Sequence, residues 1–438
     1  MVGICGSFGP HENLEELVEQ IKKDHERVLY ATNPGVAFVG KEGVCLGDGF
    51  LIGNIYSDHD PLDCFKSKME DTAKALADLS RNADGEFVIA AFENEKLCLS
   101  RDFFGKIPLY IKRRPAFEFT TGKNPFKSPS KSARMPEGSA LLVKKGKMSK
   151  KHSRPAFKFR KKRMDFFTSM PLINNALNEA IMRRSEQHKS LDIMFSGGLD
   201  STLMASIAAN YANIRLLTIG TESCDDVESA KAIEDELGAK LKILELTPDI
   251  VEKHAPGMIR AIGSKSVLDF ELALPVYLTA LNSKAKYMLS GQGADELFGG
   301  YFRYNEAYKE SPDKFEKMQI DDLKGLGKNN LERDYFAARA ADCHVSTPYL
   351  TPEMLKIALS TDTMTKLNVR QNKLVLRKIA EKMGLPKEIH NRKKKAMQYG
   401  CGLHSILQKM AKEKGFLKEK AKSEGYIGSL DMLMNSFD

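Results

Sequence analysis

The sequence predicts a two-domain α/β protein, with a strand-rich N-terminal part followed by a doubly wound parallel sheet. Three observations predict this class. The 438 residues exceed what one hydrophobic core usually supports. Short apolar runs separated by turn residues fill the first third of the chain, whereas strands alternate with helices from about residue 166. We therefore expect domains over residues 1–143 and 166–438, with a basic linker over residues 144–165.

Composition excludes several classes of protein. Hydrophobic residues make up 42% of the chain, yet no apolar run approaches the ~20 residues that cross a bilayer. The N-terminus lacks the pattern of a signal peptide, so we expect a cytoplasmic protein without a membrane partner. The seven cysteines are scattered and form no C-x-x-C pair, which argues against a disulfide framework and against a zinc ribbon.

The positive charge of the chain is local. Residues 144–163 hold eleven Lys and Arg residues and no Asp or Glu, and removing these charges from the net charge of +9 leaves −2. Such a run is typical of a solvated linker or surface strand. Contact with nucleic acid or another polyanion is the alternative.

The N-terminal part alternates short apolar segments with turns, which predicts strands with two helical pieces. The helices are expected near residues 13–27 and 64–81. The expected strands lie at residues 36–39, 49–56, 87–92, 96–100 and 108–111.

The C-terminal part alternates strands with helices, which predicts a parallel sheet whose ligands bind beyond the carboxyl ends of the strands. A helix over residues 225–237 is expected to end at Gly238. The expected strands cover residues 191–195, 214–220, 240–246 and 286–289.

The stretch Ser196-Gly197-Gly198-Leu199-Asp200-Ser201 follows the first of these strands and precedes an apolar helix. Its glycines let the backbone approach a phosphate, and the serine hydroxyls and helix N–H groups supply donors. Asp200 has the opposite charge, which calls for an accompanying cation. Because no lysine stands where a Walker loop carries one, we expect a pyrophosphate cradle. The alternative is an ordinary turn with Asp200 or Ser201 as N-cap.

A second glycine-rich loop, Ser290 to Tyr301, follows the fourth expected strand. Alone it could be a helix N-cap with favourably placed acids. Paired with the first loop, it brings Asp295 to the same edge of the sheet as Asp200. Two such carboxylates, with phosphate oxygens, are suitable ligands for Mg²⁺.

The first loop resembles the PP-loop of the N-type ATP pyrophosphatases, and the second resembles a loop of asparagine synthetases. Further segments that fit that family are residues 331–334, 347–350, 373–377, 385–389 and 392–395. The resemblance implies an adenine nucleotide α-hydrolase sheet with a helical C-terminal part. It implies that Lys394 contacts pyrophosphate and the acyl-adenylate, and that Met194, Ile219 and Gly291 belong to the ATP site.

Residues 84–92 and 100–110 are similar to the class II glutamine amidotransferase domain of the same family, which implies an Ntn-hydrolase-like α+β sandwich. Such domains begin Met-Cys-Gly-Ile, and the cysteine is the nucleophile, activated by its own α-amino group. Here Val2 holds that position. Cys5 lies three places later, and we expect a retained fold without glutaminase chemistry. Processing that exposes Cys5 is the alternative.

Three further positions depart from the family. The segment Ile52-Gly53-Asn54 stands where the family has Asn-Gly-Glu for glutamine. Gln292 replaces a glutamate, and an amide is no general base near neutral pH. Ser346 replaces an arginine that could hold a substrate carboxylate. The chain is thus identified as a diverged, archaeal-type member of the family.

The resemblance implies an AMP-forming carbon–nitrogen ligase that uses ATP and Mg²⁺. A carboxylate, aspartate first, is adenylated with release of pyrophosphate, and ammonia then forms the amide; Asp295, Gln292 and Lys394 are the expected catalytic residues. Two alternatives stay open: a ligase for another carboxylate or for tRNA, and a nucleotide-binding protein without turnover. The expected partners are small molecules, with nucleic acid as a minority alternative, and a homodimer is compatible with the sequence.

Overall fold

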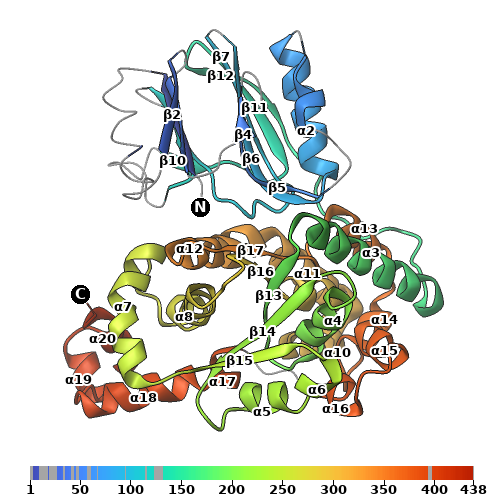
Figure 1. The fold of residues 1–438 in the computed structure, drawn as a ribbon, viewed down its shortest axis with the longest axis vertical. Helices are drawn as coiled ribbons and strands as arrows, with labels where there is room; N and C mark the ends of the chain where they lie inside the picture. Colours follow the sequence, from blue (N-terminus) through green and yellow to red (C-terminus); the bar gives the residue numbers. More distant parts are fainter. Residues whose placement is uncertain are drawn as a thin grey trace. The chain divides into compact units, whose positions relative to one another are not determined.

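The computed structural model describes residues 3–8, 18, 27–32, 35–40, 44–45, 49–56, 61–66, 68–93, 95–113, 116–122, 132–392 and 397–437. The chain forms two compact units (Figure 1). The N-terminal unit comprises Met1–Lys158, Lys324–Tyr335 and Thr351–Glu353, and the C-terminal unit comprises the rest. The N-terminal unit therefore includes two short segments from late in the sequence.

The N-terminal unit is a sandwich of two antiparallel sheets with a helix on one face, which confirms the expected α+β fold. The first sheet has the order β10-β8-β9-β1-β3-β2 and the second β12-β11-β7-β6-β5-β4. The strands of the first sheet are β1 (Gly3–Phe8), β2 (Arg27–Thr32), β3 (Gly35–Gly40), β8 (Tyr110–Lys112), β9 (Phe117–Thr120) and β10 (Ser132–Arg134). Those of the second are β4 (Val44–Cys45), β5 (Gly49–Ile55), β6 (Gly85–Glu93), β7 (Lys96–Arg101), β11 (Ser139–Lys144) and β12 (Lys147–His152).

Two apolar layers hold this unit together. One lies between the sheets, where Ile4 and Phe119 of the first sheet meet Val88 and Leu141 of the second. The other lies between the second sheet and helix α2 (Met69–Asn82), which follows the short 3₁₀ turn η1 (Pro61–Cys64). The helix expected over residues 64–81 is thus present but begins later, and the one expected at residues 13–27 lies outside the described residues.

The basic run begins inside the sheet. Lys145 and Gly146 both have positive φ, which suits the two-residue turn that joins β11 to β12. Strand β12 lies at the sheet edge, and its residues from Lys147 to Lys151 are exposed. Lysines on an edge strand discourage pairing with other chains. Residues expected to start a linker therefore form an edge strand, and this unit continues to Lys158.

The C-terminal unit is built on a parallel sheet with the order β15-β14-β13-β16-β17, which confirms the doubly wound prediction. Its strands are β13 (Ser190–Met194), β14 (Asn213–Gly220), β15 (Lys240–Glu245), β16 (Tyr287–Leu289) and β17 (His344–Ser346). The chain proceeds from β13 toward β15 on one side and continues with β16 and β17 on the other. The strand order therefore reverses between β13 and β16, which is the usual ligand position in such sheets.

Helices cover both faces of this sheet. Figure 1 shows α3 (Phe166–Gln187) and α4 (Leu199–Ala208) on one side, and α7 (Pro248–Ile262) and α8 (Val267–Leu281) on the other. The helix expected over residues 225–237 is divided into α5 (Asp225–Lys231) and α6 (Glu234–Leu237). Ile233 departs from helical φ between them, and Gly238 ends α6 in the left-handed conformation, as predicted.

The last third of the chain is helical, as expected. No helix in the described residues is long and apolar enough to cross a membrane. The remaining helices are α9 (Ala294–Phe298), α10 (Phe302–Glu310), α11 (Pro312–Leu326), a π-helical turn η3 (Gly327–Leu331), α12 (Glu332–Ala340), α13 (Pro352–Ser360), α14 (Thr363–Lys366), α15 (Leu374–Lys382), α16 (Lys387–His390), α17 (Met397–Gly400), α18 (Leu403–Glu413), α19 (Lys418–Ser423) and α20 (Ser429–Asn435).

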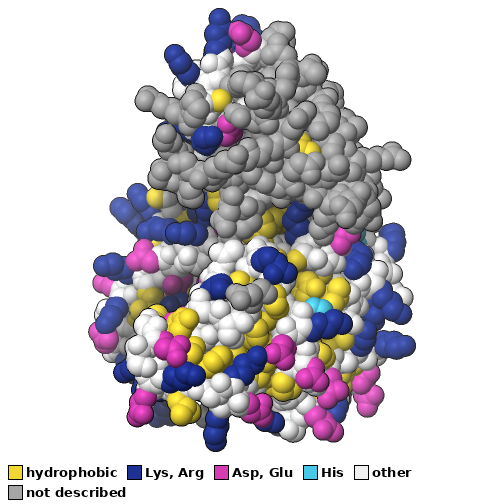
Figure 2. Space-filling view, turned by 90° about the vertical axis from the view of Figure 1, so that its left-hand side faces the viewer, with side chains coloured by type: hydrophobic (Ala, Val, Ile, Leu, Met, Phe, Trp, Pro, Cys, Tyr) yellow, Lys and Arg dark blue, Asp and Glu magenta, His cyan; other side chains and the backbone are white. Residues whose placement is uncertain are grey.

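Surface charge over the C-terminal unit is mixed. In Figure 2, Lys and Arg side chains lie among Asp and Glu side chains over the face of this unit that is drawn. This agrees with the near-neutral balance of the chain outside its basic run. The surface seen in this view gives no sign of a single large field that would steer a polyanion to this unit.

Candidate functional site

A cavity of about 170 Å³ lies in the C-terminal unit where the strand order reverses. The loops after β13 and β16 supply its polar wall, and residues of β14 supply part of its apolar wall. The structure therefore brings together, from distant parts of the sequence, nearly every ATP-site residue expected from the sequence. Those that line the cavity are Met194, Ser196, Gly198, Asp200, Ser201, Ile219, Gly291, Gln292 and Asp295.

Gly197 does not line the cavity but permits the turn that forms it. Its φ is +61°, and a Cβ atom there would lie 2.6 Å from the backbone carbon of Ser229 at the start of the next crossover. A side chain at this position would therefore be both strained and in collision with main chain. This glycine is required by close packing against α5, whereas Gly198 faces the cavity.

The first loop is held by its own serines. Ser201 Oγ donates to Gly198 O at 3.2 Å, and Gly198 N donates to Ser196 Oγ at 3.3 Å. The first turn of the ten-residue helix α4 begins at Leu199, so its N–H groups are directed at the cavity wall. Hydroxyl and main-chain donors next to a helix start are suited to bind an anion such as a phosphate.

Lys373 lies between the two aspartates that the sequence assigns to a metal. Its Nζ is 2.5 Å from Asp200 Oδ2 and 2.5 Å from Asp295 Oδ1. The lysine side chain is only 3% exposed. The two carboxylates therefore converge on one point in the cavity, and in the described structure that point holds an ammonium group.

This lysine was included in a family segment by sequence comparison but was given no role there. The sequence did hold an indication of such a role. Two converging carboxylates in a nucleotide site need a counter-charge, and a lysine stands at position 373, directly before a helix. What the sequence did not reveal is the folding that places the start of α15 against the loops after β13 and β16. The family match alone, without the positions of the residues in space, could not show that Lys373 as well as Lys394 was a candidate for the site.

The residues of this site are suited to hold Mg²⁺. Asp200 Oδ1 is buried and accepts no hydrogen bond from the described residues. A buried carboxylate oxygen without a donor is costly unless a cation or water completes it. Carboxylate oxygens are the ligands that Mg²⁺ prefers, with substrate phosphates and waters filling the other positions. Asp200 and Asp295 therefore meet the chemical requirement on observations made in this chain.

Two arginines, Arg377 and Arg392, also line the cavity. Arg392 donates to Ser196 O at 2.9 Å and to Asp226 Oδ1 at 3.2 Å, which ties its segment to the first loop. Arg377 donates to Asn372 O at 2.7 Å and to His390 O at 2.7 Å. Both guanidinium groups thus bind main-chain carbonyls that shape the cavity. Neither arginine was singled out as a site residue from the sequence.

Glu296 lies behind Asp295 and is 2% exposed. Burial, with the adjacent Asp295 charge as the next cause, raises the pKa of Glu296 to about 7. Tyr301 donates its hydroxyl to Glu296 Oε1 at 2.7 Å. The loop that presents Asp295 is therefore supported by buried polar contacts of its own.

Two expected features are not among the described residues that line the cavity. Lys394 belongs to residues 393–396, which are outside the described residues. Ser346, at the end of β17, is fully buried and accepts a hydrogen bond from Arg184 Nε at 2.7 Å. Ser346 does not belong to the cavity lining. The residue that stands in place of the family's arginine therefore serves the packing of α3 against the sheet.

The positions of the expected degenerate glutaminase site lie in the N-terminal unit, except that Val2 is outside the described residues. Ile52, Gly53 and Asn54 belong to β5. Gly53 has φ +90°, and a Cβ atom there would be 1.8 Å from Glu86 O. Cys5 lies within β1, paired with β3 and β9, and is fully buried. Burial raises the pKa of the Cys5 thiol far above its usual range.

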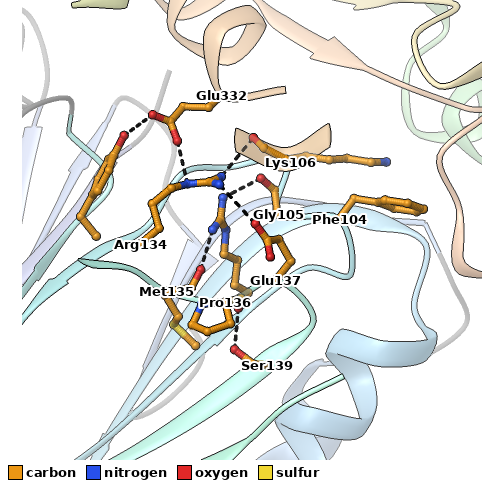
Figure 3. Close-up of polar contacts among 12 residues, drawn as sticks. Phe104, Gly105, Lys106, Arg134, Met135, Pro136, Glu137, Ser139 and Glu332 are labelled. Atoms are coloured by element: carbon orange, nitrogen blue, oxygen red, sulfur yellow. Dashed lines mark hydrogen bonds and ion pairs between the residues drawn. The ribbon is translucent and has the colours of Figure 1, made fainter. Parts of the chain in front are cut away.

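A polar network fixes the late segment of the N-terminal unit (Figure 3). Arg134 pairs with Glu332 Oε2 at 2.7 Å and with Glu137 Oε1 at 3.2 Å, and it donates to Gly327 O at 3.0 Å. Tyr110 donates to the same carboxylate of Glu332. The network binds residues 324–335 to strands β8 and β10. Its charged groups thus have a structural role in this unit.

These features are those expected of an ATP-dependent ligase of the PP-loop type, with a serine- and glycine-rich loop at the reversal point of a parallel sheet. The chain belongs to the asparagine synthase family. The family model described as asparagine synthase matches residues 172–314 and 308–429, which together exceed half of the chain.

Curated relatives agree with this assignment. A protein named "putative asparagine synthetase (glutamine-hydrolyzing) 1" from Methanocaldococcus jannaschii is 27% identical over 395 residues, with 77% of this chain and 73% of the relative covered. The nodule asparagine synthetase (glutamine-hydrolyzing) of Pisum sativum is 26% identical over 53% of this chain and 43% of its own length. The chain thus spans less than half of the plant relative.

Solved structures show weaker likeness. An NH3-dependent NAD synthetase from Campylobacter jejuni has a TM-score of 0.30 at 14% identity, covering 63% of this chain and 93% of its own. A glutamine phosphoribosylpyrophosphate amidotransferase from B. subtilis has a TM-score of 0.25 at 9% identity, covering 56% and 90%. At these scores neither structure informs the fold or function of this chain.

Proposed function

We propose that this protein makes an amide from a carboxylate, with aspartate as the first candidate, using ATP and free ammonia. The carboxylate oxygen attacks the α-phosphate of ATP and pyrophosphate leaves. Ammonia then attacks the acyl-adenylate, and AMP leaves with the amide formed. The observation that carries the proposal is the convergence of the serine- and glycine-rich loop with Asp200, Asp295 and Lys373 around one cavity.

The residues of the cavity have distinct tasks in this reaction. Ser196, Ser201 and the first turn of α4 bind the departing pyrophosphate, and Met194 and Ile219 form apolar walls for the adenine ring. Asp200 and Asp295 would hold Mg²⁺, and the bound metal would supply neutralisation of phosphate charge. Catalysis then consists mainly of positioning and charge compensation.

We propose that glutamine is not the nitrogen donor. Val2 stands at the position of the family's nucleophile. A chain cut to begin at Cys5 would lose Ile4, which is fully buried and whose N–H donates to Thr121 Oγ1 at 3.1 Å. Exposure of the Cys5 amine by processing would therefore remove a core residue from β1, at a cost of roughly 2–5 kcal/mol. Ammonia taken from solution avoids this requirement.

A second candidate is a ligase for a carboxylate other than aspartate. Both arginines of the described cavity lining are committed to main-chain carbonyls, and Ser346 is buried away from the lining. Bidentate recognition of a second carboxylate is therefore not provided by these residues. An acceptor with one carboxylate, or one carried on a larger molecule, would meet this arrangement equally well.

A pyrophosphate-release screen tests the proposal. The full chain is incubated with ATP, Mg²⁺ and each amino acid, with ammonium or glutamine as nitrogen donor. We expect pyrophosphate and AMP with aspartate and ammonium, asparagine in the product analysis, and no product from glutamine alone. Release of ADP and phosphate would overturn the reaction type, and robust glutamine hydrolysis would overturn the assignment of ammonia. Carboxylate-dependent ATP–pyrophosphate exchange would exclude a protein without turnover.

A further inference from the structure

The ammonium group of Lys373 occupies the point where the proposed metal ligands meet. Its Nζ lies 2.5 Å from Asp200 Oδ2 and 2.5 Å from Asp295 Oδ1, so one cation serves both carboxylates. A divalent cation held by the same two oxygens would lie about 2.0–2.1 Å from each. The two cations cannot share that point, because both the space and the charge oppose it.

The position of Lys373 is built into the fold. Gly300 lacks a side chain where a Cβ atom would lie 2.2 Å from Lys373 Cε and 1.9 Å from Asp295 Oδ1. Lys373 has φ +52°, an uncommon conformation for a residue other than glycine. The adjacent Asn372 donates to Gly300 O at 2.7 Å, and Arg377 donates to Asn372 O at 2.7 Å. The backbone is thus fixed, and the flexible part of Lys373 is its four-carbon stem.

Charge in the described cavity lining is balanced before any ligand binds. The carboxylates of Asp200, Asp226 and Asp295 face three cations, Lys373, Arg377 and Arg392. A free divalent cation entering this site would have to displace Lys373 and leave its ammonium group without a partner in a low-dielectric setting. A polyphosphate that arrives with the metal supplies that partner.

We infer that Lys373 is an internal counter-ion that keeps the metal site closed to free divalent cations and makes metal binding conditional on nucleotide. This inference rests on the proposed ATP function, because the nucleotide phosphates are the anion to which Nζ transfers. Binding of metal and nucleotide is then coupled, and linkage requires that each raises the affinity for the other by the same factor.

The test measures Mn²⁺ binding to the full chain by isothermal titration, with and without an ATP analogue whose α–β bridge is a methylene group. Three proteins are compared: wild type, Lys373→Met and Lys378→Met. Lys378 lies on α15, the helix that Lys373 directly precedes, is 43% exposed and pairs only with Glu381 among the residues described, so its variant is a matched loss of one charge. Circular dichroism and thermal unfolding check that each variant is folded.

We expect Lys373→Met to bind Mn²⁺ without nucleotide at least about tenfold more tightly than wild type, and Lys378→Met to stay within about twofold. The analogue should increase Mn²⁺ affinity at least about tenfold more in wild type than in Lys373→Met. Equal Mn²⁺ affinity of wild type and Lys373→Met without nucleotide would overturn the inference. So would an equal gain in Lys378→Met.

Two further outcomes, a variant that does not fold and an analogue that does not bind, can be told apart from the results above. If Lys373→Met does not fold, wild type alone decides, because Mn²⁺ binding that is equally tight with and without the analogue overturns the coupling. If the analogue does not bind wild type at all, the proposed function fails. The comparison of Mn²⁺ affinities without nucleotide still decides whether Lys373 occupies the cation position.

Discussion

Both units bury charged side chains, but they use the buried charge differently. In the N-terminal unit, Lys106 pairs with Glu86 at 2.8 Å with both side chains buried, and Arg101 donates three hydrogen bonds to main-chain carbonyls. In the C-terminal unit, Asp200 keeps a buried oxygen without a donor beside a cavity. Buried charge that is fully satisfied stabilises one arrangement of the chain, whereas incompletely satisfied charge is available to a ligand.

The buried charge of the N-terminal unit also shifts a side-chain pKa. Burial lowers the pKa of Arg101 to about 10, with Arg134 as the next cause, although three carbonyls accept its hydrogens. The N-terminal unit therefore accepts a desolvation cost for structure alone. This is compatible with our proposal that the domain keeps its fold without glutaminase chemistry, since a polar interior of this kind serves folding.

The largest expected effect is on the chemistry of the C-terminal unit. Asp295→Asn removes a carboxylate proposed to hold Mg²⁺, and we expect pyrophosphate release to fall by at least about 100-fold, since it removes charge stabilisation at the transition state. Lys373 keeps Asp200 as a partner, so the fold should persist. Pyrophosphate release and thermal unfolding are measured together, with the exposed Asp313→Asn as control. Activity within fivefold of wild type would remove Asp295 from the metal site.

A substitution in the N-terminal unit is expected to affect stability and not nucleotide binding. Glu86→Gln leaves the buried Lys106 ammonium without a charged partner, which costs about 3–5 kcal/mol. Hydrogen exchange over β5, β6 and β7 should therefore become faster, while binding of an ATP analogue is unchanged. Glu93→Gln is the matched control. Glu93 lies on the same strand, but its side chain is 42% exposed and pairs with Lys96. That variant should cost less than about 1 kcal/mol. Lost nucleotide binding in Glu86→Gln would contradict the separation of roles.

The two glycines of the first loop give a sharper comparison within one site. Gly197→Ala places a Cβ atom 2.6 Å from main chain at φ +61°, and we expect a loss of about 2 kcal/mol or more. Gly198→Ala meets only the Ser196 hydroxyl at 3.1 Å, which can rotate away. Denaturant unfolding and binding of the ATP analogue measure both variants. Equal losses would mean that the packing of α5 does not determine the loop.

Much of this arrangement could be predicted from the sequence, for physical reasons. The spacing of hydrophobic residues and the positions of turn residues locate strands. The order of strands and loops around Ser196 and Asp295 could therefore be predicted from the sequence. The phosphate loop was specific because glycine and serine are required at fixed positions. The helix predicted over residues 225–237 is divided at Ile233, which departs from helical φ, and the hydrophobic pattern did not indicate this break.

What the sequence could not provide is convergence of distant segments. Lys373 is 173 residues from Asp200, and no local pattern indicates that their side chains meet. The same holds for Glu332, which joins Tyr110 across 222 residues. The basic run was interpreted as a solvated linker or a surface strand, because charge alone does not distinguish the two. The turn at Lys145-Gly146 was the available signal.

A pH measurement tests a buried cation outside the cavity. Burial lowers the pKa of Lys366 from 10.5 to about 7, with Arg163 as the next cause, and its Nζ donates to Gln319 Oε1 at 3.1 Å. Glu316, Asp362 and the Phe159 ring also face it.

Between pH 7 and 10 the unfolded chain holds a proton that the folded chain has released, so the free energy of unfolding should rise with pH in that range. From pH 7 to 9 the rise attributable to Lys366 is about 2 kcal/mol. Lys366→Met should lose this rise, which urea unfolding at several pH values measures. An identical slope in wild type and variant would show that Lys366 stays protonated.

The smallest expected effect concerns the basic edge strand. Lys147, Lys150 and Lys151 are exposed on β12, which pairs on one side only among the described strands. Replacing all three with Gln should change the free energy of unfolding by less than about 1 kcal/mol, because exposed charges on a strand face contribute little. The variant should, however, associate more readily at high concentration, since the lysines protect an unpaired edge. Light scattering against concentration measures this, and co-purified RNA is quantified in the same preparations. RNA bound to wild type and lost from the variant, with a steep salt dependence, would instead assign the strand to a polyanion.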